Sequence, residues 1–353
     1  MKIAILSREK NKHSETFIRN QVRYLFEGNT HHLYGRGFPY YEGSSPIPGN
    51  TLTESFIEYF SQNGIQAVLA NYATTGFDVM DACAELDLPL ITHFHGWTAY
   101  RHHFVEDHMH LFPKLFDVSN RIIAVSSEMK NRLISLGAPK GKICHLVCGV
   151  SAELFQFRLE CPNPSTAPLY LFVGRFTEKK QPGLVIRAFE HVQRTLPEAR
   201  LVMIGAGHLL EATQERAAEP GIADKVTFRG TCSPQEVAAW MQRATALVQH
   251  SVTAEDGNRE GTPNVILEAM LSGLPVVGTR HGGIKDVIDE ETNGLLADEW
   301  DIDSMANHML RLAQNEQFAK RLAQNARQKA MTNYTLDHYM SSLENIVEEA
   351  ARK

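Results

Sequence analysis

Residues 169–195 read LYLFVGRFTEKKQPGLVIRAFEHVQRT and pass from an apolar run through a polar loop into a segment of helical period. Leu169–Val173 is a short continuous apolar run, which is typical of a strand buried in a parallel sheet. Gly174 lets the chain turn sharply where the strand ends, and Pro182 suits the first turn of a helix over Gly183–Thr195. The stretch therefore predicts a strand–loop–helix unit.

The same unit repeats on both sides of this stretch. Short apolar runs predict strands at Ile3–Leu6, His32–Tyr34, Ala67–Ala70, Leu90–His93, Ile122–Val125 and Ile143–Val147, and later at Leu201–Ile204, Val226–Phe228, Ala246–Gln249 and Pro275–Val277. Helical period predicts helices at Glu15–Phe26, Leu52–Gln62, Phe77–Leu86, Ser127–Leu136, Gln235–Arg243, Val265–Leu271 and Ile302–Gln314. Such alternation predicts an α/β fold with doubly wound parallel sheets.

The length of 353 residues favours two domains, because single cores rarely grow so large. Cys161–Pro168 is rich in proline and small polar residues, which indicates a linker. We therefore expect an N-terminal Rossmann-like domain over residues 1–160 and a C-terminal one over 161–334, followed by an amphipathic helix over Leu336–Ala351. Ligands bind outside the carboxyl ends of such strands, so two facing sheets predict a cleft between the domains.

The formal charge of −6 provides no general attraction for nucleic acid. Five cysteines with irregular spacing argue against a disulfide framework and favour a cytoplasmic protein with reduced thiols. The first residues are too quickly charged for a secretory signal, and no apolar run approaches the length of a membrane span. Peripheral membrane association stays open.

Two loops of the second half carry groups suited to an anionic ligand. After the strand at 169–173, Arg175 offers a planar fork of donors and Lys180 a compact charge, a pair that suits a diphosphate, although solvated surface cations are the plainer alternative. Thr262 and Pro263 predict an N-cap and a first helical residue, and a helix start binds anions through its free N–H groups. Glu260 precedes this start. Glu268 lies among apolar neighbours of the helix, where paired sugar hydroxyls would suit it as partners and a structural buried Glu is the alternative.

Two loops of the first half are candidates as well. Strand alternation puts His93 and His95 on one side, at a strand end. Further histidines follow, but their spacing matches no common zinc pattern, and Cys144 and Cys148 lie far away in sequence, so we expect no metal site. The loop Lys12–Phe17 after the first strand offers a helix start near Ser14, whose N–H groups suit a phosphate.

Taken together, these motifs resemble the GT-B glycosyltransferases, specifically the large retaining family 4. The resemblance spans nearly the whole chain, and the first-half motifs are similar to those of members that build bacterial exopolysaccharides such as colanic acid. It rests on Gly174-Arg175 with Lys180, Glu260 with Glu268, Gly282-Gly283-Ile284, Ala124-Val125-Ser126, Gly149-Val150-Ser151, Ser14–Ile18 and His93–Gly96.

The resemblance implies a GT-B fold and roles for named residues. Arg175 and Lys180 would bind the donor diphosphate and stabilise the departing charge, Glu268 would hold the ribose, and Glu260 would hold the transferred sugar with His95 nearby. The implied catalytic set is Glu260, His95, Arg175 and Lys180, and the implied donor-binding set is Gly174, Arg175, Lys180, Gly261, Thr262, Asn264, Val265, Glu268 and Thr16. The family needs neither metal nor cofactor, and its last helix usually returns to the first domain.

Two departures from the family pattern affect the donor. Paired glycines of the first loop are replaced by Ser14-Glu15-Thr16, and Pro263 stands where many members have Gly, which removes one N–H donor. The Glu-Gly-x-Pro form is similar to that of members using UDP-hexoses. The resemblance implies a saccharide or lipid-linked acceptor on the first domain, where we expect Phe104, Met109, Leu111 and Phe112 to line the acceptor side unless they belong to the core.

Three other functions compete with the transferase. A sugar-nucleotide epimerase shares the two-domain fold, but it needs acid and base carboxylates around the sugar. A non-catalytic nucleotide-sugar-binding protein would not need a complete catalytic set, so the presence of Glu260, Arg175 and Lys180 together argues against it. A histidine-dependent metallohydrolase would need a metal.

Overall fold

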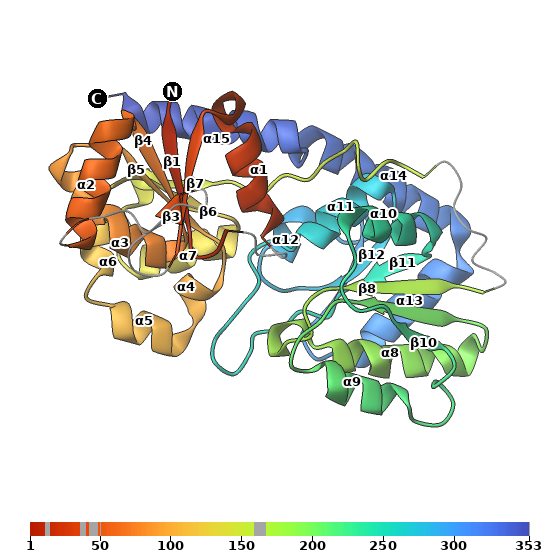
Figure 1. Ribbon diagram of the computed structural model, residues 1–353. Coiled ribbons are helices and arrows are strands. Elements are labelled where there is room, and N and C mark those ends of the chain that lie inside the picture. Colours follow the sequence, from red (N-terminus) through yellow and green to blue (C-terminus); the bar gives the residue numbers. More distant parts are fainter. Residues whose placement is uncertain (11–14, 36–39, 42–48, 50, 159–166, 353) are drawn as a thin grey trace. The chain divides into compact units, whose positions relative to one another are not determined.

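The computed structural model describes residues 1–10, 15–35, 40–41, 49, 51–158 and 167–352, and the chain forms two compact units (Figure 1). Unit 1 comprises residues 1–148 and 337–353, and unit 2 comprises residues 149–336. The first boundary thus differs from the predicted one at residue 160. The reason is that the chain already bonds to unit 2 before the proline-rich segment: Val150 N–H donates to Tyr334 O at 3.0 Å and Arg158 N–H to Ser272 O at 3.1 Å. Most of the predicted linker, residues 161–166 of 161–168, lies outside the described residues.

Unit 1 is built on a seven-stranded sheet of order β3-β2-β1-β4-β5-β6-β7. All of its pairings are parallel except that of β2 with β3. The order reverses direction between β1 and β4, where loops at the carboxyl ends of parallel strands usually bind ligands. The strands are β1 Ile3–Ser7, β2 Thr30–Tyr34, β3 Tyr40–Tyr41, β4 Ala67–Asn71, β5 Leu90–Phe94, β6 Ser119–Ala124 and β7 Ile143–His145.

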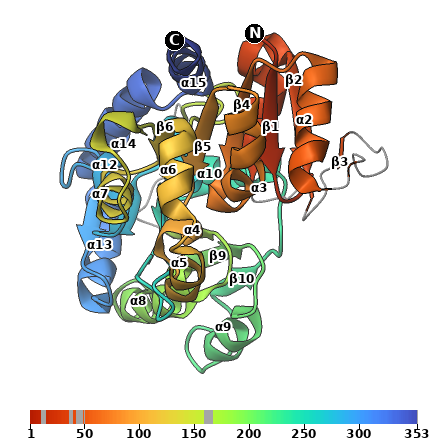
Figure 2. The same cartoon turned by 90° about the vertical axis from the view of Figure 1, so that its left-hand side faces the viewer.

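Helices cover both faces of this sheet (Figure 2). On one face, α1 and the 3₁₀ turn that follows it contact the C-terminal helix α15. Gln21 of α1 donates to Tyr339 Oη at 2.7 Å, and Phe26 N–H of the turn donates to Glu344 at 2.6 Å. On the other face, α2, α3 and α6 pack side by side. The helices are α1 Thr16–Tyr24, α2 Leu52–Asn63, α3 Tyr72–Glu85, α4 Trp97–Tyr100, α5 His102–His108, α6 Phe112–Val118, α7 Ser127–Ser135 and α15 Leu336–Ala351, with 3₁₀ turns η1 Leu25–Gly28 and η2 Lys140–Lys142.

Unit 2 repeats the plan with a six-stranded, wholly parallel sheet of order β10-β9-β8-β11-β12-β13. Its order reverses between β8 and β11. The strands are β8 Leu169–Val173, β9 Arg200–Ile204, β10 Val226–Phe228, β11 Ala246–Val248, β12 Val276–Thr279 and β13 Leu295–Ala297. The helices are η3 Glu178–Lys180, α8 Pro182–Thr195, α9 Leu210–Ala217, α10 Pro234–Arg243, α11 Asn264–Ser272, α12 Ile284–Val287, α13 Ile302–Gln314 and α14 Glu316–Asn333.

The core of unit 2 lies between the sheet and the layer formed by α8 and α13. Tyr170 of β8 and Phe189 of α8 are wholly buried there, and Tyr170 Oη donates to Met309 O at 2.8 Å. These observations confirm the predicted pair of doubly wound α/β domains. No helix among the described residues is long and apolar enough to cross a bilayer.

Candidate functional site

Three loops of unit 2 meet at the carboxyl ends of β8, β11 and β12. The β8 loop contains Gly174–Gln181, the β11 loop runs to Pro263 before α11, and the β12 loop contains His281 and Gly282. The β8 and β11 loops flank the point where the strand order reverses, which is where parallel α/β sheets bind their ligands.

Glu260 and two lysines form a buried ion cluster at this point. Lys179 Nζ lies 3.2 Å and Lys180 Nζ 3.4 Å from Glu260 Oε1, and all three residues are at least nine-tenths buried. Burial alone would raise the pKa of Glu260, but the two lysines and His281 lower it to about 2. Burial lowers the pKa of Lys180, opposed by Glu260. The cluster holds two ammonium groups against one carboxylate, so a net positive charge faces any ligand.

The structure brings the predicted Lys180 and Glu260 together and adds Lys179, which sequence reasoning missed. The 3₁₀ turn η3 and the positive φ of 39° at Gln181 tighten the loop, so that both neighbouring lysines turn inward. Lys179 also donates to Arg259 O at 3.4 Å. The only signal for Lys179 was its place beside Lys180.

Two glycines of β9's loop support the Gly174 turn. Gly205 and Gly207 have φ of +139° and +154°, and a Cβ on either would collide with the carbonyl oxygen of Gly174 or Phe176. Phe176 N–H donates to Ala206 O at 2.9 Å. The Gly205-Ala206-Gly207 segment therefore packs against the loop that carries Arg175 and Lys180.

His281 and Glu299 hold the Glu260 backbone, and both were missed from the sequence. Glu260 N–H donates to His281 Nε2 at 3.1 Å, while His281 Nδ1 lies 2.6 Å from Glu299 Oε1. A second hydrogen bond joins the same two loops, because Gly283 N–H donates to Gly261 O at 2.7 Å. Burial would raise the pKa of Glu299, but hydrogen bonds from His281 and a backbone N–H lower it to about 2. The signal available was the His281-Gly282-Gly283 tripeptide.

Helix α11 begins at Asn264, one residue after the first helical position that Thr262 and Pro263 predicted. Pro263, with φ −67° and ψ 118°, is the N-cap, and no side chain caps the helix, so the predicted N-cap role of Thr262 was wrong. Proline in extended conformation shifts the start to Asn264. Gly261 is buried, whereas Thr262, Asn264 and Val265 are partly exposed at this helix start.

Glu268 and Arg175 are predicted donor ligands whose charged groups form no ion pair with any residue that the structure describes. Glu268 lies about one helical turn after the start of α11 and is partly exposed. It forms no hydrogen bond or ion pair with a described residue. Burial raises its pKa to about 7. Arg175 is exposed and likewise has no ion pair within the described parts of the chain. Both groups are available to a ligand.

His95 and Thr16 belong to unit 1. His95 Nε2 bonds to Asn71 Oδ1 at 2.9 Å, and its ring stacks on Phe17 with centroids 4.0 Å apart. The ring of His93 lies 3.9 Å away, which confirms that the two histidines share one side of β5. Thr16 is the first residue of α1, with Glu15 as N-cap. The proposed cap Ser14, with Lys12 and His13, lies outside the described residues.

The predicted acceptor-side residues divide between core and surface. Phe112 is fully buried against Phe116, with ring centroids 5.4 Å apart, so it belongs to the core. Met109 is 45% exposed, and the ring of Phe104 packs 4.9 Å from that of Trp97.

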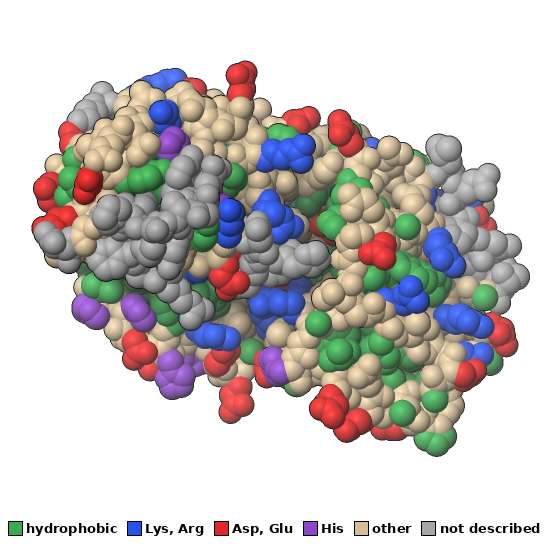
Figure 3. All heavy atoms as spheres, in the orientation of Figure 1, with side chains coloured by type: hydrophobic (Ala, Val, Ile, Leu, Met, Phe, Trp, Pro, Cys, Tyr) green, Lys and Arg blue, Asp and Glu red, His purple; other side chains and the backbone are tan. Residues whose placement is uncertain are grey.

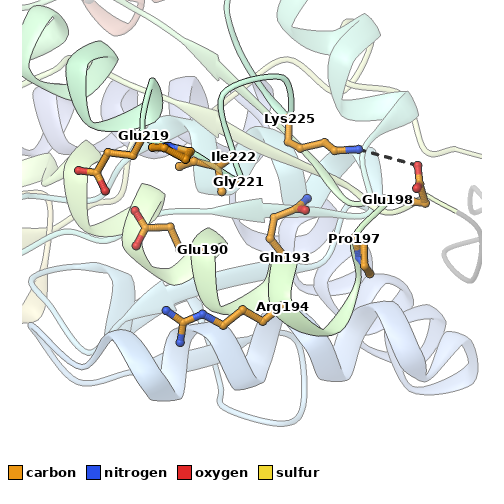
Figure 4. Close-up of a pocket in the computed structure, with 10 residues that line it drawn as sticks. Glu190, Gln193, Arg194, Pro197, Glu198, Glu219, Gly221, Ile222 and Lys225 are labelled. Carbon is orange, nitrogen blue, oxygen red and sulfur yellow. Dashed lines mark ion pairs between the residues drawn. The ribbon is translucent and has the colours of Figure 1, made fainter.

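A cavity of about 480 Å³ in unit 2 lies elsewhere (Figure 4). It is lined by the C-terminal part of α8 and the loops before β9 and β10, including Arg194, Glu219 and Lys225. It contains none of the predicted site residues. Its lining carries charges of both signs, and Lys225 Nζ lies 4.0 Å from Glu198 Oε2.

Family models match both halves of the chain. "Glycosyltransferase Family 4" matches residues 10–154 and "Glycosyl transferases group 1" matches residues 157–329. The amylovoran biosynthesis glycosyltransferase AmsK of Erwinia amylovora is 32% identical over 74% of this chain and 64% of its own length. The putative colanic acid biosynthesis glycosyltransferase WcaL of Escherichia coli is 28% identical over 64% of this chain and 55% of its own. The chain thus spans less than two thirds of these relatives.

Solved structures show the same fold. Anabaena Alr3699/HepE in complex with UDP and glucose superposes with a TM-score of 0.81 over 99% of both chains at 16% identity. Sucrose-phosphate synthase from Thermosynechococcus elongatus gives a TM-score of 0.77 over 98% of both chains at 18% identity. These likenesses confirm the expected GT-B fold.

Proposed function

Because this chain belongs to glycosyltransferase family 4, we propose that it transfers a hexose from a UDP-sugar, with retention of anomeric configuration, to a saccharide or lipid-linked saccharide. The names of AmsK and WcaL favour a role in cell-surface polysaccharide biosynthesis, and the UDP complexes of HepE favour UDP as the carrier. The reaction would take place in the cytoplasm or at the cytoplasmic face of the membrane.

The buried lysine pair carries this proposal. Lys179 and Lys180 share one carboxylate, so the cluster with Glu260 is one negative charge short. A diphosphate beside the β8 loop supplies that charge, and the exposed Arg175 adds a planar fork of donors to it. The free N–H groups at the start of α11 favour the same anion or the sugar hydroxyls.

Glu268 is the second support for a nucleotide. Its side chain is partly exposed and has no protein partner among the described residues, and burial of the carboxyl group raises its pKa to about 7. Hydrogen-bond donors from a ligand would offset this loss of solvation. The two hydroxyls of a ribose donate to both oxygens of such a carboxylate. We therefore assign Glu268 to the ribose.

The transfer step needs no metal in this proposal. The acceptor oxygen attacks the anomeric carbon while the bond from that carbon to the diphosphate oxygen breaks, and the acceptor proton passes to the departing phosphate. Fixed cations stabilise the charge that develops on the leaving group, which is the role of Arg175 and Lys180. Glu260 and His95 would hold the transferred sugar through its hydroxyls.

A donor panel tests the proposal. Purified protein is incubated in EDTA with UDP-glucose, UDP-galactose, UDP-N-acetylglucosamine or GDP-mannose, and nucleotide release and the anomeric configuration of the product are measured by NMR. We expect turnover of a UDP-sugar with retention, abolished in Lys180→Met and preserved in the surface control Lys225→Met. Turnover of GDP-mannose alone would exclude the UDP assignment, and release of an epimerised UDP-sugar would favour the epimerase.

A further inference from the structure

A thiol and two imidazoles meet in unit 1, although the long sequence separation of Cys148 from the histidines had argued against a metal site. His93 and His95 follow each other on one side of β5, and Cys148, after β7, joins them. One potential ligand atom from each residue lies within 4.8 Å of the other two. Cys148 lies far from the histidines in the sequence, but the parallel strands β5, β6 and β7 bring the ends of these segments to the same edge of the sheet.

We propose that His93, His95 and Cys148 form a binding site for Zn²⁺ or a similar thiophilic divalent ion, and that the bound ion inhibits the transferase. Imidazole nitrogen and thiolate sulfur are the ligands that zinc prefers in proteins. The binding half of this proposal stands on the cluster alone. The inhibitory half rests on the proposed function, because it requires that His95 contact the sugar.

The spacing of the three residues suits a zinc ion. Zn–N bonds of about 2.0–2.1 Å and a Zn–S bond of about 2.3 Å place ligand atoms of a tetrahedral site roughly 3.3–3.8 Å apart. The observed limit of 4.8 Å means that the side chains need to close by about 1.5 Å at most. Rotation about side-chain bonds accommodates such a movement.

The ring of His93 has an unmet bonding requirement. His93 is fully buried, and its Nε2 has no hydrogen-bond partner among the described residues. Its Nδ1 is occupied by Gln21 Nε2 at 3.3 Å. Nε2 is therefore the nitrogen that is free to bind an ion, and ligation would remove the cost of an enclosed polar atom without a partner.

His95 is already oriented as a ligand would be. Its Nε2 bonds to Asn71 Oδ1, and because an amide oxygen only accepts, Nε2 carries the proton and Nδ1 keeps its lone pair. Metal-binding histidines typically donate their other N–H to such an oxygen, which fixes the ring and its tautomer.

Gln21 opposes binding, and this makes the proposal testable by a gain of affinity. Gln21 donates its amide N–H to His93 Nδ1 and Tyr339 Oη, and its Oε1 accepts from Asn71 Nδ2 at 2.9 Å. A metal on His93 Nε2 moves the ring proton to Nδ1, which would then face a donor. A carboxylate at position 21 would accept from His93, Tyr339 and Asn71 at once. Gln21→Glu is thus expected to strengthen zinc binding by about 10-fold, the scale on which outer-shell partners act.

Cys148 completes the set as the thiolate ligand. It is 5% exposed and bonds to Tyr339. Coordination forms the zinc–sulfur bond and releases the thiol proton to solvent. Three protein ligands leave a fourth position for water.

The experiment uses untagged full-length protein dialysed against a chelator. Zn²⁺ binding is measured by calorimetry, and Co²⁺ is added as a spectroscopic probe, because a cobalt–thiolate bond gives an intense near-ultraviolet band. The test variants are Cys148→Ser and Gln21→Glu. One matched control is the partly exposed thiol in Cys144→Ser. The other is the double variant His102→Asn/His103→Asn, which removes two exposed histidines of α5. Figure 3 shows histidines gathered at this edge of unit 1.

We expect one zinc ion per chain, a thiolate band in wild type and both controls, and at least 100-fold weaker binding without the band in Cys148→Ser. Zinc is expected to inhibit sugar transfer by wild type and to lose that effect in Cys148→Ser. Binding that survives in Cys148→Ser, or that disappears in the α5 control, would overturn the site. If circular dichroism shows that Cys148→Ser is unfolded, His93→Asn replaces it with the same expectation. Zinc binding without inhibition would overturn the inhibitory half alone. Absence of transferase activity in the zinc-free protein, with zinc binding intact, would reject the proposed function while leaving the site.

Discussion

Replacing Glu260 by glutamine removes the one negative charge of a buried cluster while keeping the shape of the side chain. In wild type, Glu260 Oε1 lies 3.2 Å from Lys179 Nζ and 3.4 Å from Lys180 Nζ. In Glu260→Gln both ammonium groups stay buried and lose their counter-charge. We expect a large loss of stability in unit 2, because an uncompensated buried charge is costly.

The size of this loss follows from the pKa of Glu260. The fold lowers it from 4.5 to about 2, and a pKa difference of about 2.5 at 1.36 kcal/mol per pH unit corresponds to about 3 kcal/mol. This value agrees with the roughly 3–5 kcal/mol expected for breaking a buried ion pair. For a domain of this size it corresponds to a fall in Tm of roughly 6–12 °C.

The sign of the pH dependence gives a second check. An acid whose pKa is lowered by folding stabilises the fold above its ordinary pKa, and that stabilisation is lost as the pH falls from 4.5 towards 2. Urea unfolding of wild type and Glu260→Gln should therefore differ by a constant amount between pH 7 and pH 5, and by less at pH 3. Adding Lys179→Met should restore part of the loss, because one orphan ammonium group disappears. Equal stability of the two proteins at pH 7, or a difference that does not change down to pH 3, would refute the reasoning.

Three further predictions concern other parts of the fold. Burial raises the pKa of Glu268 to about 7, so UDP affinity measured by calorimetry should rise from pH 6 to pH 8 more steeply in wild type than in Glu268→Gln. The same dependence of UDP affinity on pH in both proteins would show that Glu268 does not bind the ribose. Gly205→Ala should destabilise unit 2 by at least about 2 kcal/mol in urea unfolding, because φ is +139° and the added Cβ would collide with the Gly174 carbonyl. The control Gly183→Ala, which has open space around it, should be neutral or slightly stabilising, and equal effects of the two variants would contradict the packing of the β8 loop. Tyr339→Phe removes the 2.7 Å bond from Gln21 and should cost about 1–2 kcal/mol in thermal or urea unfolding, and an unchanged midpoint would show that α15 contributes no such bond.

The strands could be predicted because buried parallel strands form continuous apolar runs. Leu169–Val173 and Val226–Phe228 agree with β8 and β10 to the residue. β13, Leu295–Ala297, was missed, and so was β3, which is only two residues long. Helix α14 was missed because its buried face consists largely of alanines such as Ala323 and Ala326, whose small side chains give little periodic contrast.

The sequence predicts site residues that can be recognised within one loop, but not residues whose role depends on a contact with another loop. Lys180 and Glu260 were each expected at a strand end, and the structure brings them together. His281 and Glu299 could not be found in this way, because their roles depend on a bond from His281 to the backbone of Glu260, 21 residues away in sequence. Cys148 was set aside because it lies far from His93 and His95 in sequence, and only the pairing of β5, β6 and β7 shows that the three residues are neighbours.

Binding of UDP in the presence of EDTA tests the central claim most directly. Thermal unfolding is followed for wild type and Glu268→Ala with UDP, GDP, ADP or buffer alone, and the shift in Tm follows the ratio of ligand concentration to Kd. We predict that UDP alone stabilises wild type and that Glu268→Ala weakens this effect. Stabilisation by no nucleotide, or an equal response of the variant, would contradict a donor site built on Glu268 and the lysine pair.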